Sequence, residues 1–259
     1  MKVRNMPINR YLTLVFYLTY AELKSESKKF FVSYLWWIVE PVVNMAVYYV
    51  VFGVLLNRGT DNYIAFLLIG LIPWRWFSAA VMQSSMIIGQ QKQLIKRVVV
   101  PKTIFPTVNV LTHTFKFVIV FAVLVLFLMI LGMNPSIHYL ALIPLLISQF
   151  FFILGVSYVL CSFVPFMMDL KLAINSAIMM LFFLSGIFFS GENLTGNART
   201  LFYLNPLAHM IEAYRDILLK QHWPSSLGIF ILFSLGVVAM FLGRFLLHKW
   251  SHMYPKVLR

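Results

Sequence analysis

The stretch YIAFLLIGLIPWRWFSAAVMQSSMIIG, residues 63–89, decides the fold class of this chain. Arg75 is its single charged residue and stands between Trp74 and Trp76. A bilayer has a hydrocarbon core of about 30 Å, which about 20 apolar residues cross as a helix. Because lipid offers no hydrogen-bond partner to free backbone groups, such a stretch forms a helix. The stretch therefore predicts a transmembrane helix that carries a guanidinium near its middle.

The composition assigns the whole chain to the same class. Of its 259 residues, 61% are hydrophobic and 11% are charged. A soluble domain carries about 25% charged and about 45–50% apolar residues. The composition is therefore typical of a polytopic membrane protein, so the net charge of +13 does not indicate a nucleic-acid partner. The single cysteine, Cys161, excludes a disulfide within the chain.

Hydrophobic stretches divide the chain into one transmembrane domain over residues 1–259. The predicted fold class is all-α integral membrane, with an N-terminal interface helix and short re-entrant external gate helices between spans five and six. No alternating pattern of about ten residues favours a β-barrel. The six predicted spans are 34–56, 63–89, 107–132, 138–164, 172–190 and 226–247.

The basic residues predict the orientation of these spans. Lys and Arg gather before the first span, between spans two and three, between spans four and five, and after span six, whereas the other loops are poor in them. Cytoplasmic loops of membrane proteins carry the excess of Lys and Arg. Both termini are therefore expected in the cytoplasm.

Residues 1–33 predict an amphipathic helix in the cytoplasmic interface. Glu22, Glu26 and Lys29 share one helical face, and an apolar face that includes Leu12 and Phe16 lies elsewhere on the helix. The alternative is a plain lipid-anchored leader.

The connector QKQLIKRVVVPKT, residues 91–103, is basic with a short apolar run before Pro101. It predicts a docking element for a cytoplasmic partner, or only an anchor that sets topology. The candidate coupling residues in it are Lys92, Lys96, Arg97, Val99 and Pro101.

Residues 191–225 are too polar to span the membrane, yet LFYLNPLAHMI within them is too apolar for a free loop. The Asn205-Pro206 pair breaks the segment in two. We expect two short helices that dip into the external leaflet and form a gate over 191–212; a loop resting on the bundle is the alternative. The candidate gate residues are Asn205, Pro206, His209 and Glu212.

Aromatic side chains are abundant in the first two spans, and rings at mid-depth suggest a path on which sugar rings stack. Trp36 and Trp37 also fit an ordinary cytoplasmic interfacial belt, which is the alternative for these two residues. Arg75 is expected to face a wet channel, or to pair with Glu212 or Asp216, because facing lipid is costly. The candidate channel residues are Trp36, Trp37, Tyr48, Trp74, Arg75, Trp76 and Phe77.

The sequence lacks the motifs of several enzyme classes. It contains no GxxxxGK[ST] loop for ATP, no HExxH and no GxSxG, and its histidines have no metal-binding spacing within a span. A membrane-embedded glycosyltransferase would need carboxylates or a metal near an interface, and none of the eight Asp and Glu residues pair convincingly. We expect a chain that is not an enzyme and binds no metal or cofactor itself.

Four motifs in register then carry a family resemblance. The motifs are YLWWIVEPVVNMAVY (34–48), LIGLIPWRWFSAAV (68–81), QLIKRVVVPKTIFP (93–106) and LNPLAHMIEAYRDILL (204–219). Together they resemble the membrane subunits of ABC transporters of the polysaccharide-exporter type, the permeases of O-antigen, teichoic acid and capsule export, and the O-antigen type most of all.

The resemblance implies a homodimer with two copies of a cytoplasmic ABC ATPase, which would hold ATP and Mg. It further implies export of a polysaccharide linked to undecaprenyl diphosphate across the bacterial inner membrane, with the interface helix and the 91–101 connector touching the ATPase. Capsule or teichoic acid, or a small lipid or drug, are the alternative substrates. Five basic residues are candidates for attracting the diphosphate and the anionic leaflet, or serve only to set topology: Arg4, Arg10, Lys28, Lys29 and Arg97.

Overall fold

The computed structural model of the chain describes residues 7–28, 39, 42–43, 46–47, 50–51, 62–97 and 100–257. The first predicted span, 34–56, thus lies almost entirely outside the described residues. So do the predicted site residues Arg4, Lys29, Trp36, Trp37, Tyr48 and Val99, and the side chains of Lys28 and Arg97.

The described residues form helices and no strand. The α-helices are α1 (Ile8–Lys28), α3 (Tyr63–Gln90), α4 (Lys92–Arg97), α5 (Ile104–Ile130), α6 (Leu142–Phe163), α7 (Leu170–Leu184), α8 (Gly196–Tyr203), α9 (Pro206–Leu218), α10 (Ser226–Lys249) and α11 (Tyr254–Val257). Two short 3₁₀ helices, η2 (Ile137–Ala141) and η3 (Gly191–Asn193), precede α6 and α8.

Four of these helices are long and apolar enough to cross a membrane: α3, α5, η2 with α6, and α10. They have 24–28 residues, about 36–42 Å at 1.5 Å per residue. The apolar helix α7 has 15 residues, about 22 Å, which is short of the bilayer core. The all-helical fold class is confirmed within the described part of the chain, where four helices are long and apolar enough to span a membrane. The count of six spans stays a prediction.

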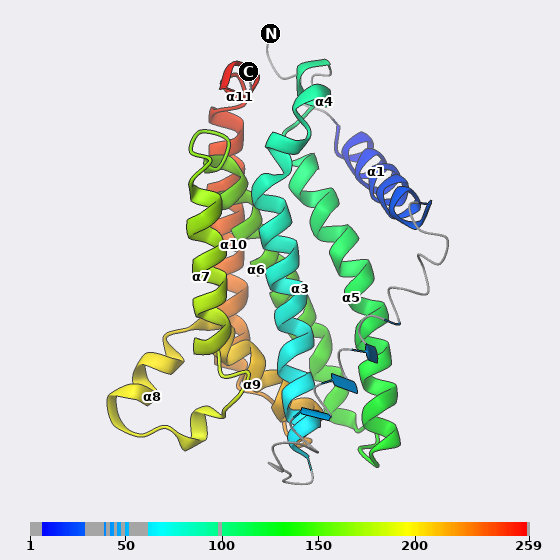
Figure 1. Cartoon of the computed structure of the whole chain (residues 1–259), viewed down its shortest axis with the longest axis vertical. Coiled ribbons are helices and arrows are strands. Elements are labelled where there is room, and N and C mark those ends of the chain that lie inside the picture. The colour runs from blue at the N-terminus through cyan, green and yellow to red at the C-terminus, as the bar shows by residue number, and fades with distance from the viewer. Residues whose placement is uncertain are drawn as a thin grey trace.

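Helix α3 is the centre of the bundle (Figure 1). It packs against α5, α6, α7 and α9, and most of its apolar residues are buried. The helices α5 and α10 are apolar, and few of their residues are fully buried. Apolar side chains that a membrane protein leaves uncovered face lipid, so the fold buries α3 and presents α5 and α10 outward.

The helices α6 and α10 touch through their backbones because glycines line their contact. A Cβ atom added at Gly236 would lie 2.5 Å from the backbone nitrogen of Phe152, and one added at Gly243 would lie 2.5 Å from Cβ of Tyr158. Small residues let helices approach closely where lipid removes the hydrophobic drive for association. This pair is the most extensive helix contact in the described structure.

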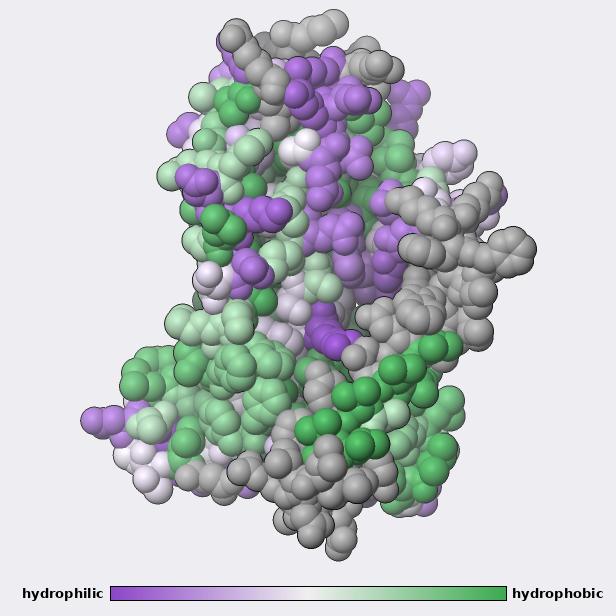
Figure 2. Space-filling model, in the orientation of Figure 1, coloured by the Kyte–Doolittle hydropathy of each residue, from purple (hydrophilic) through white to green (hydrophobic). Residues whose placement is uncertain are grey.

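The bundle has two different ends. One end, which we call the α4–α11 end, carries α4, α11 and the start of α5, and the opposite end, the α8–α9 end, carries α8 and α9 (Figure 1). On the face shown in Figure 2, hydrophilic side chains gather over the half nearer α4, and the other half is mainly hydrophobic. The described basic residues at the α4–α11 end include Lys92, Lys96, Lys102, Lys171, Arg244, Lys249 and Lys256.

We predict that Gly236→Val destabilises the protein by about 1–3 kcal/mol, the usual cost of overpacking a close contact. Thermal unfolding of the purified chain in detergent measures the effect. Gly89→Val is the matched control, because a Cβ atom at Gly89 meets nothing within 4 Å. Equal unfolding temperatures for the two variants would contradict the close α6–α10 contact.

Candidate functional site

At the α8–α9 end, the helical structure is interrupted at the position that the sequence predicts. Helix α8 ends at Tyr203, and α9 begins at Pro206. The side chain of Asn205 caps α9 by accepting a hydrogen bond from the backbone N–H of Leu207 at 3.0 Å, and Pro206 lacks the N–H that a first helical turn leaves unused. Two short helices therefore meet at Asn205-Pro206. Their role as re-entrant external gate helices stays a prediction.

Arg215 fixes α9 to the rest of the bundle. It is 3% exposed. Its guanidinium donates to the carbonyl oxygens of Gly186 at 2.7 Å and Ile187 at 2.8 Å, and more weakly to those of Phe66 and Phe189 at 3.3 Å. It also lies 3.4 Å above the ring centre of Phe66, where a cation–π attraction adds to the hydrogen bonds. Arg215 thus joins α9 to α3 and to the chain that follows α7.

A glycine on α3 makes room for this arginine. A Cβ atom at Gly70 would lie 3.0 Å from Nη2 of Arg215. Nothing in the local sequence pattern marks Arg215 as buried. The glycine at position 70 and the bare carbonyls beyond α7 meet it only in the folded chain.

The predicted gate residues Glu212 and His209 hold the α8–α9 corner. Oε1 of Glu212 accepts hydrogen bonds from the backbone N–H of Gly191 at 3.0 Å and from the hydroxyl of Tyr203 at 3.2 Å. Nε2 of His209 lies 2.8 Å from the carbonyl oxygen of Tyr203. The corner is therefore tied through side chains rather than left as a free loop.

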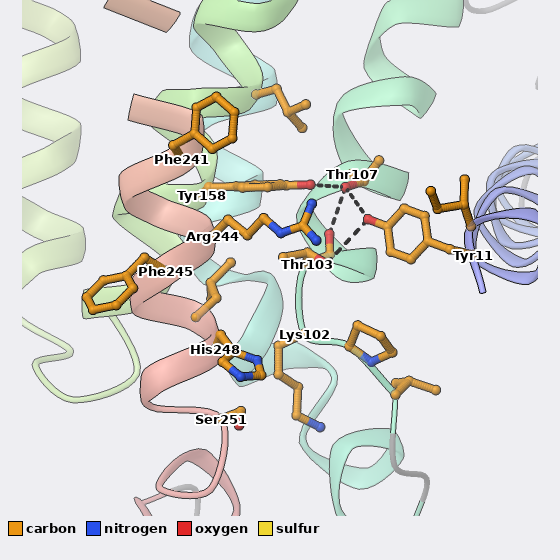
Figure 3. A pocket seen from close by; sticks show the side chains of 15 residues that line it. Tyr11, Lys102, Thr103, Thr107, Tyr158, Phe241, Arg244, Phe245, His248 and Ser251 are labelled. Carbon is orange, nitrogen blue, oxygen red and sulfur yellow. Dashed lines mark hydrogen bonds between the residues drawn. The ribbon is translucent and has the colours of Figure 1, made fainter. Parts of the chain in front are cut away.

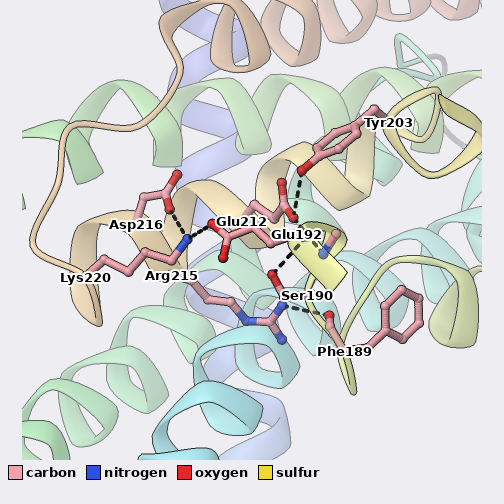
Figure 4. Close-up of polar contacts among 9 residues, drawn as sticks. Phe189, Ser190, Glu192, Tyr203, Glu212, Arg215, Asp216 and Lys220 are labelled. Atoms are coloured by element: carbon pink, nitrogen blue, oxygen red, sulfur yellow. Dashed lines mark hydrogen bonds and ion pairs between the residues drawn. The ribbon is translucent and has the colours of Figure 1, made fainter. Parts of the chain in front are cut away.

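A charged surface cluster lies beside this corner (Figure 4). Nζ of Lys220 lies 2.7 Å from Oε1 of Glu192 and 3.0 Å from Oδ1 of Asp216. The hydrogen bond from Lys220 lowers the pKa of Glu192. Burial acts to lower the pKa of Lys220, but its two carboxylate partners outweigh burial and raise it. Both acids near Arg215 in sequence thus have partners of their own, so the predicted pairing of Arg75 with Glu212 or Asp216 is wrong within the described chain.

Arg75 is exposed on α3. Its side chain has no hydrogen bond, ion pair or ring contact with any described residue. Ala79, one turn further along the helix, is also exposed. Other helices cover most of α3, so Arg75 marks the face of this central helix that the described part of the chain leaves open.

The neighbouring rings do not share this face. Trp74, Trp76 and Phe77 are 3–5% exposed. Trp76 stacks on Phe117 with ring centres 4.2 Å apart, and Trp74 packs against Phe182 at 5.8 Å. The prediction that these three rings line an open path is therefore wrong for the single chain. Adjacent residues on a helix point about 100° apart, so Arg75 faces outward while its two neighbours enter the core.

The helix α1 is tethered to α5 at both of its ends. The hydroxyl of Tyr11 donates to Oγ1 of Thr103 at 3.3 Å and lies 3.2 Å from Oγ1 of Thr107. At the other end, Glu26 and Lys116 form an ion pair at 2.5 Å. The intramembrane Lys116 thus meets an acid from the interface helix, and a displacement of α1 would pull on α5.

The outer face of α1 is apolar. Ile8, Leu12, Phe16, Tyr17 and Tyr20 are 48–75% exposed. Such a face on a helix beside the bundle (Figure 1) suits the boundary between lipid and water. Arg10 is exposed on the same helix.

The predicted coupling segment forms α4 at the α4–α11 end. Ile95 is buried against the bundle, whereas Lys96 and Leu94 are exposed and Lys92 is half-buried. Pro101 follows at the start of the turn into α5. The segment thus offers a basic and partly apolar surface at the end of the central helix.

The family model for ABC-2 type transporters matches residues 13–219, from α1 to the end of α9. The chain belongs to the ABC-2 type transporter family. As an ABC-2 type membrane chain it is a multi-pass membrane subunit that works with a partner ATPase. The matched region contains both α4 and the α8–α9 corner.

Curated relatives of this ABC-2 type chain match it over most of its length. Two proteins from Klebsiella pneumoniae, each named O-antigen export system permease protein RfbA, are 29% and 28% identical over 246 residues, 95% of either chain. A protein of the same name from Myxococcus xanthus is 26% identical over 233 residues, 89% of this chain and 90% of the relative.

We predict that Arg215→Met loosens α9 in this ABC-2 type chain. The change strips buried carbonyls of their donors, at a cost on the order of 3 kcal/mol. Hydrogen–deuterium exchange of the purified chain should rise over residues 186–218. Arg199→Met is the matched control, because Arg199 is exposed and only approaches the Tyr203 ring at 5.9 Å. Equal exchange in the two variants would show that Arg215 does not anchor α9.

Proposed function

We propose that this chain is the permease subunit of an ATP-driven exporter that moves a polysaccharide linked to undecaprenyl diphosphate, such as O-antigen, out of the cytoplasm across the inner membrane. The observation that carries the proposal is the match to O-antigen export permeases over 95% of both chains. A match of that extent includes the spans, the connector and the α8–α9 corner together.

In this proposal the α4–α11 end faces the cytoplasm. The described basic residues concentrate there, whereas the α8–α9 end mixes its few basic residues with Glu192, Glu212 and Asp216. Cytoplasmic ends of membrane proteins carry the excess of Lys and Arg. Both termini are then cytoplasmic, and α8 with α9 forms an external gate.

The ATPase would dock on α4 and α1. The exposed Lys96 and Leu94 of α4 lie at one end of the central helix, and α1 is fastened to α5 by Tyr11 and Glu26. Closure of two ATPase subunits on ATP and Mg would press on these elements and move α3 and α5 together. Lys92, Arg97, Val99 and Pro101 complete the proposed coupling surface.

Two copies of the chain would enclose the channel. The open face of α3 around Arg75 and Ala79 is the part of the central helix that the chain's own described helices leave uncovered. Arg75 would then line a wet path and attract the diphosphate of the carrier, since a guanidinium fits phosphate oxygens well. Trp36, Trp37 and Tyr48 stay predicted channel residues, whereas Trp74, Trp76 and Phe77 are buried in the core. Arg4, Arg10, Lys28, Lys29 and Arg97 stay predicted to attract the headgroup at the membrane surface.

The proposal is tested by purifying the chain with a candidate ATPase subunit in lipid. We expect ATP hydrolysis to rise when lipid-linked O-antigen is added. Stimulation by lipid-linked capsule or teichoic acid, or by a small lipid alone, would instead support the corresponding alternative substrate. Failure of every ABC ATPase subunit of the source cell to copurify would contradict the exporter assignment.

We predict that Arg75→Gln lowers export while the protein still folds, because Arg75 is exposed and bonds to no described residue. Surface display of O-antigen in cells that depend on this chain measures export. Elution of the purified variant as a single size-exclusion peak in detergent confirms folding. Arg75→Lys should retain part of the activity through its charge, and Arg199→Gln is the control for loss of an exposed arginine elsewhere. Wild-type export by Arg75→Gln would demote Arg75 to a residue without a role in transport.

We predict that Lys96→Glu reduces copurification of the ATPase, because it reverses a charge on the proposed docking helix. Lys171→Glu is the matched control, an exposed lysine at the same end of the bundle on α7. Pull-down with each tagged variant measures the amount of ATPase recovered per permease chain. Equal recovery with Lys96→Glu and the wild type would remove α4 from the docking surface.

A further inference from the structure

A cavity of about 970 Å³ lies at the α4–α11 end, among α1, the turn before α5, α6 and α10 (Figure 3). None of the residues assigned to the channel or the gate lines it. Its polar lining includes Tyr11, Lys102, Thr103, Thr107, Arg244 and His248.

The lining carries positive charge without a counter-charge. Lys102, Arg244 and His248 face the cavity, and no described residue that lines it is acidic. The side chains of Lys102 and Arg244 form no ion pair or hydrogen bond with any described residue. A site of this kind attracts an anion, because two bases and a histidine share one space.

The positive charge of Lys102 is buried and costly to leave without a partner. It is 8% exposed, and burial lowers the pKa of its ammonium group. A buried charge without a partner disfavours the folded state unless something neutralises it. An anion in the cavity would supply that partner.

The hydroxyl groups of the cavity favour an oxygen-rich anion. A chain of hydrogen bonds links α1, α5 and α6 through the hydroxyl groups of Tyr11, Thr103, Thr107 and Tyr158. The hydroxyl oxygens of Thr107 and Tyr158 lie 2.6 Å apart. The guanidinium of Arg244 extends from α10 toward this chain (Figure 3). Arg pairs with phosphate through two parallel hydrogen bonds, and hydroxyls complete such a shell.

An apolar wall leads from the charged part of the cavity along α10. Phe241 and Phe245 line the same cavity, lie one helical turn apart and are 62% and 61% exposed. Arg244 and His248 follow the same helical face toward the end of this candidate span. Phe241 lies nearer the middle of the span than Arg244 and His248, and Phe245 lies between these two charged positions. A charged end of a span that is followed by a bare aromatic ring matches the two parts of a lipid.

We propose that this cavity binds the phosphate headgroup of a membrane lipid, with Arg244, Lys102 and His248 around the phosphate and the acyl or prenyl chain along Phe241 and Phe245. The proposal does not depend on which substrate the protein exports. A lipid held there would fill the space between α1 and α10 and fasten the interface helix to the bundle.

Native mass spectrometry of the full chain in neutral detergent tests the proposal with phosphatidylglycerol as the probe and phosphatidylcholine as the reference lipid. We expect Arg244→Gln to weaken phosphatidylglycerol binding about fivefold, the effect of about 1 kcal/mol for one basic residue near an anionic lipid. Lys249→Gln is the matched control, a lysine at the same helix end that does not line the cavity. Lys102→Met should weaken binding in the same direction, and it keeps the test decisive if Arg244→Gln fails to fold.

Competition then identifies the source of the phosphate. Undecaprenyl diphosphate is added to each protein with phosphatidylglycerol bound. If it displaces phosphatidylglycerol from the wild type but not from the Arg244→Gln variant, the cavity is assigned to the polyprenyl carrier. No displacement would assign it to a bilayer phospholipid. Binding that is equal in the wild type, Arg244→Gln and Lys102→Met would overturn the proposal. Binding of inorganic phosphate with the same variant dependence, in the absence of lipid binding, would overturn the lipid assignment.

Discussion

The Arg215 guanidinium is the contact on which the α8–α9 end depends. Four carbonyl oxygens, one from α3 and three from the chain after α7, converge on one place, and the single buried guanidinium donates a hydrogen bond to each. In a membrane, carbonyls that a helix leaves unpaired must find donors inside the protein. Arg215 therefore lets α7 end early and lets the chain turn back beneath the bundle as α8 and α9.

The central helix α3 connects this end to the other. Near its middle, the carbonyl of Pro73 accepts a hydrogen bond from Gln149 on α6 at 3.0 Å, and Gln149 accepts one from the hydroxyl of Tyr214 on α9 at 2.6 Å. At its far end α3 is followed directly by α4. Close-packed interiors move as units rather than deforming smoothly, so a shift at α4 would reach α9 through α3. In the proposed function, this route would link the partner ATPase to a gate at the α8–α9 end.

Local sequence patterns predict some of these features and not others. Periodicity and length identified the four long helices within a few residues, and Asn205-Pro206 marked the break before α9, because caps and prolines act locally. The prediction that Trp74 and Trp76 line a path is wrong for the single chain, since depth along a helix says nothing about which helix packs against each side. The sequence does not predict the roles of Arg215, Gly70 and Tyr11 for the same reason: their partners lie on other segments, 26 to 149 residues away.

The sequence by itself determined that this protein is an all-helical membrane chain with a basic end, a polar break between its last spans and the motifs of a polysaccharide-exporter permease. These properties follow from the cost of exposing polar backbone to lipid and from the charge of each local segment of the sequence. Only the tertiary structure decided that Arg75 faces outward while its neighbouring rings are core, that Arg215 is buried, and that Lys102, Arg244 and Tyr11 share a cavity. Each depends on which helices meet, and close packing between distant segments settles that.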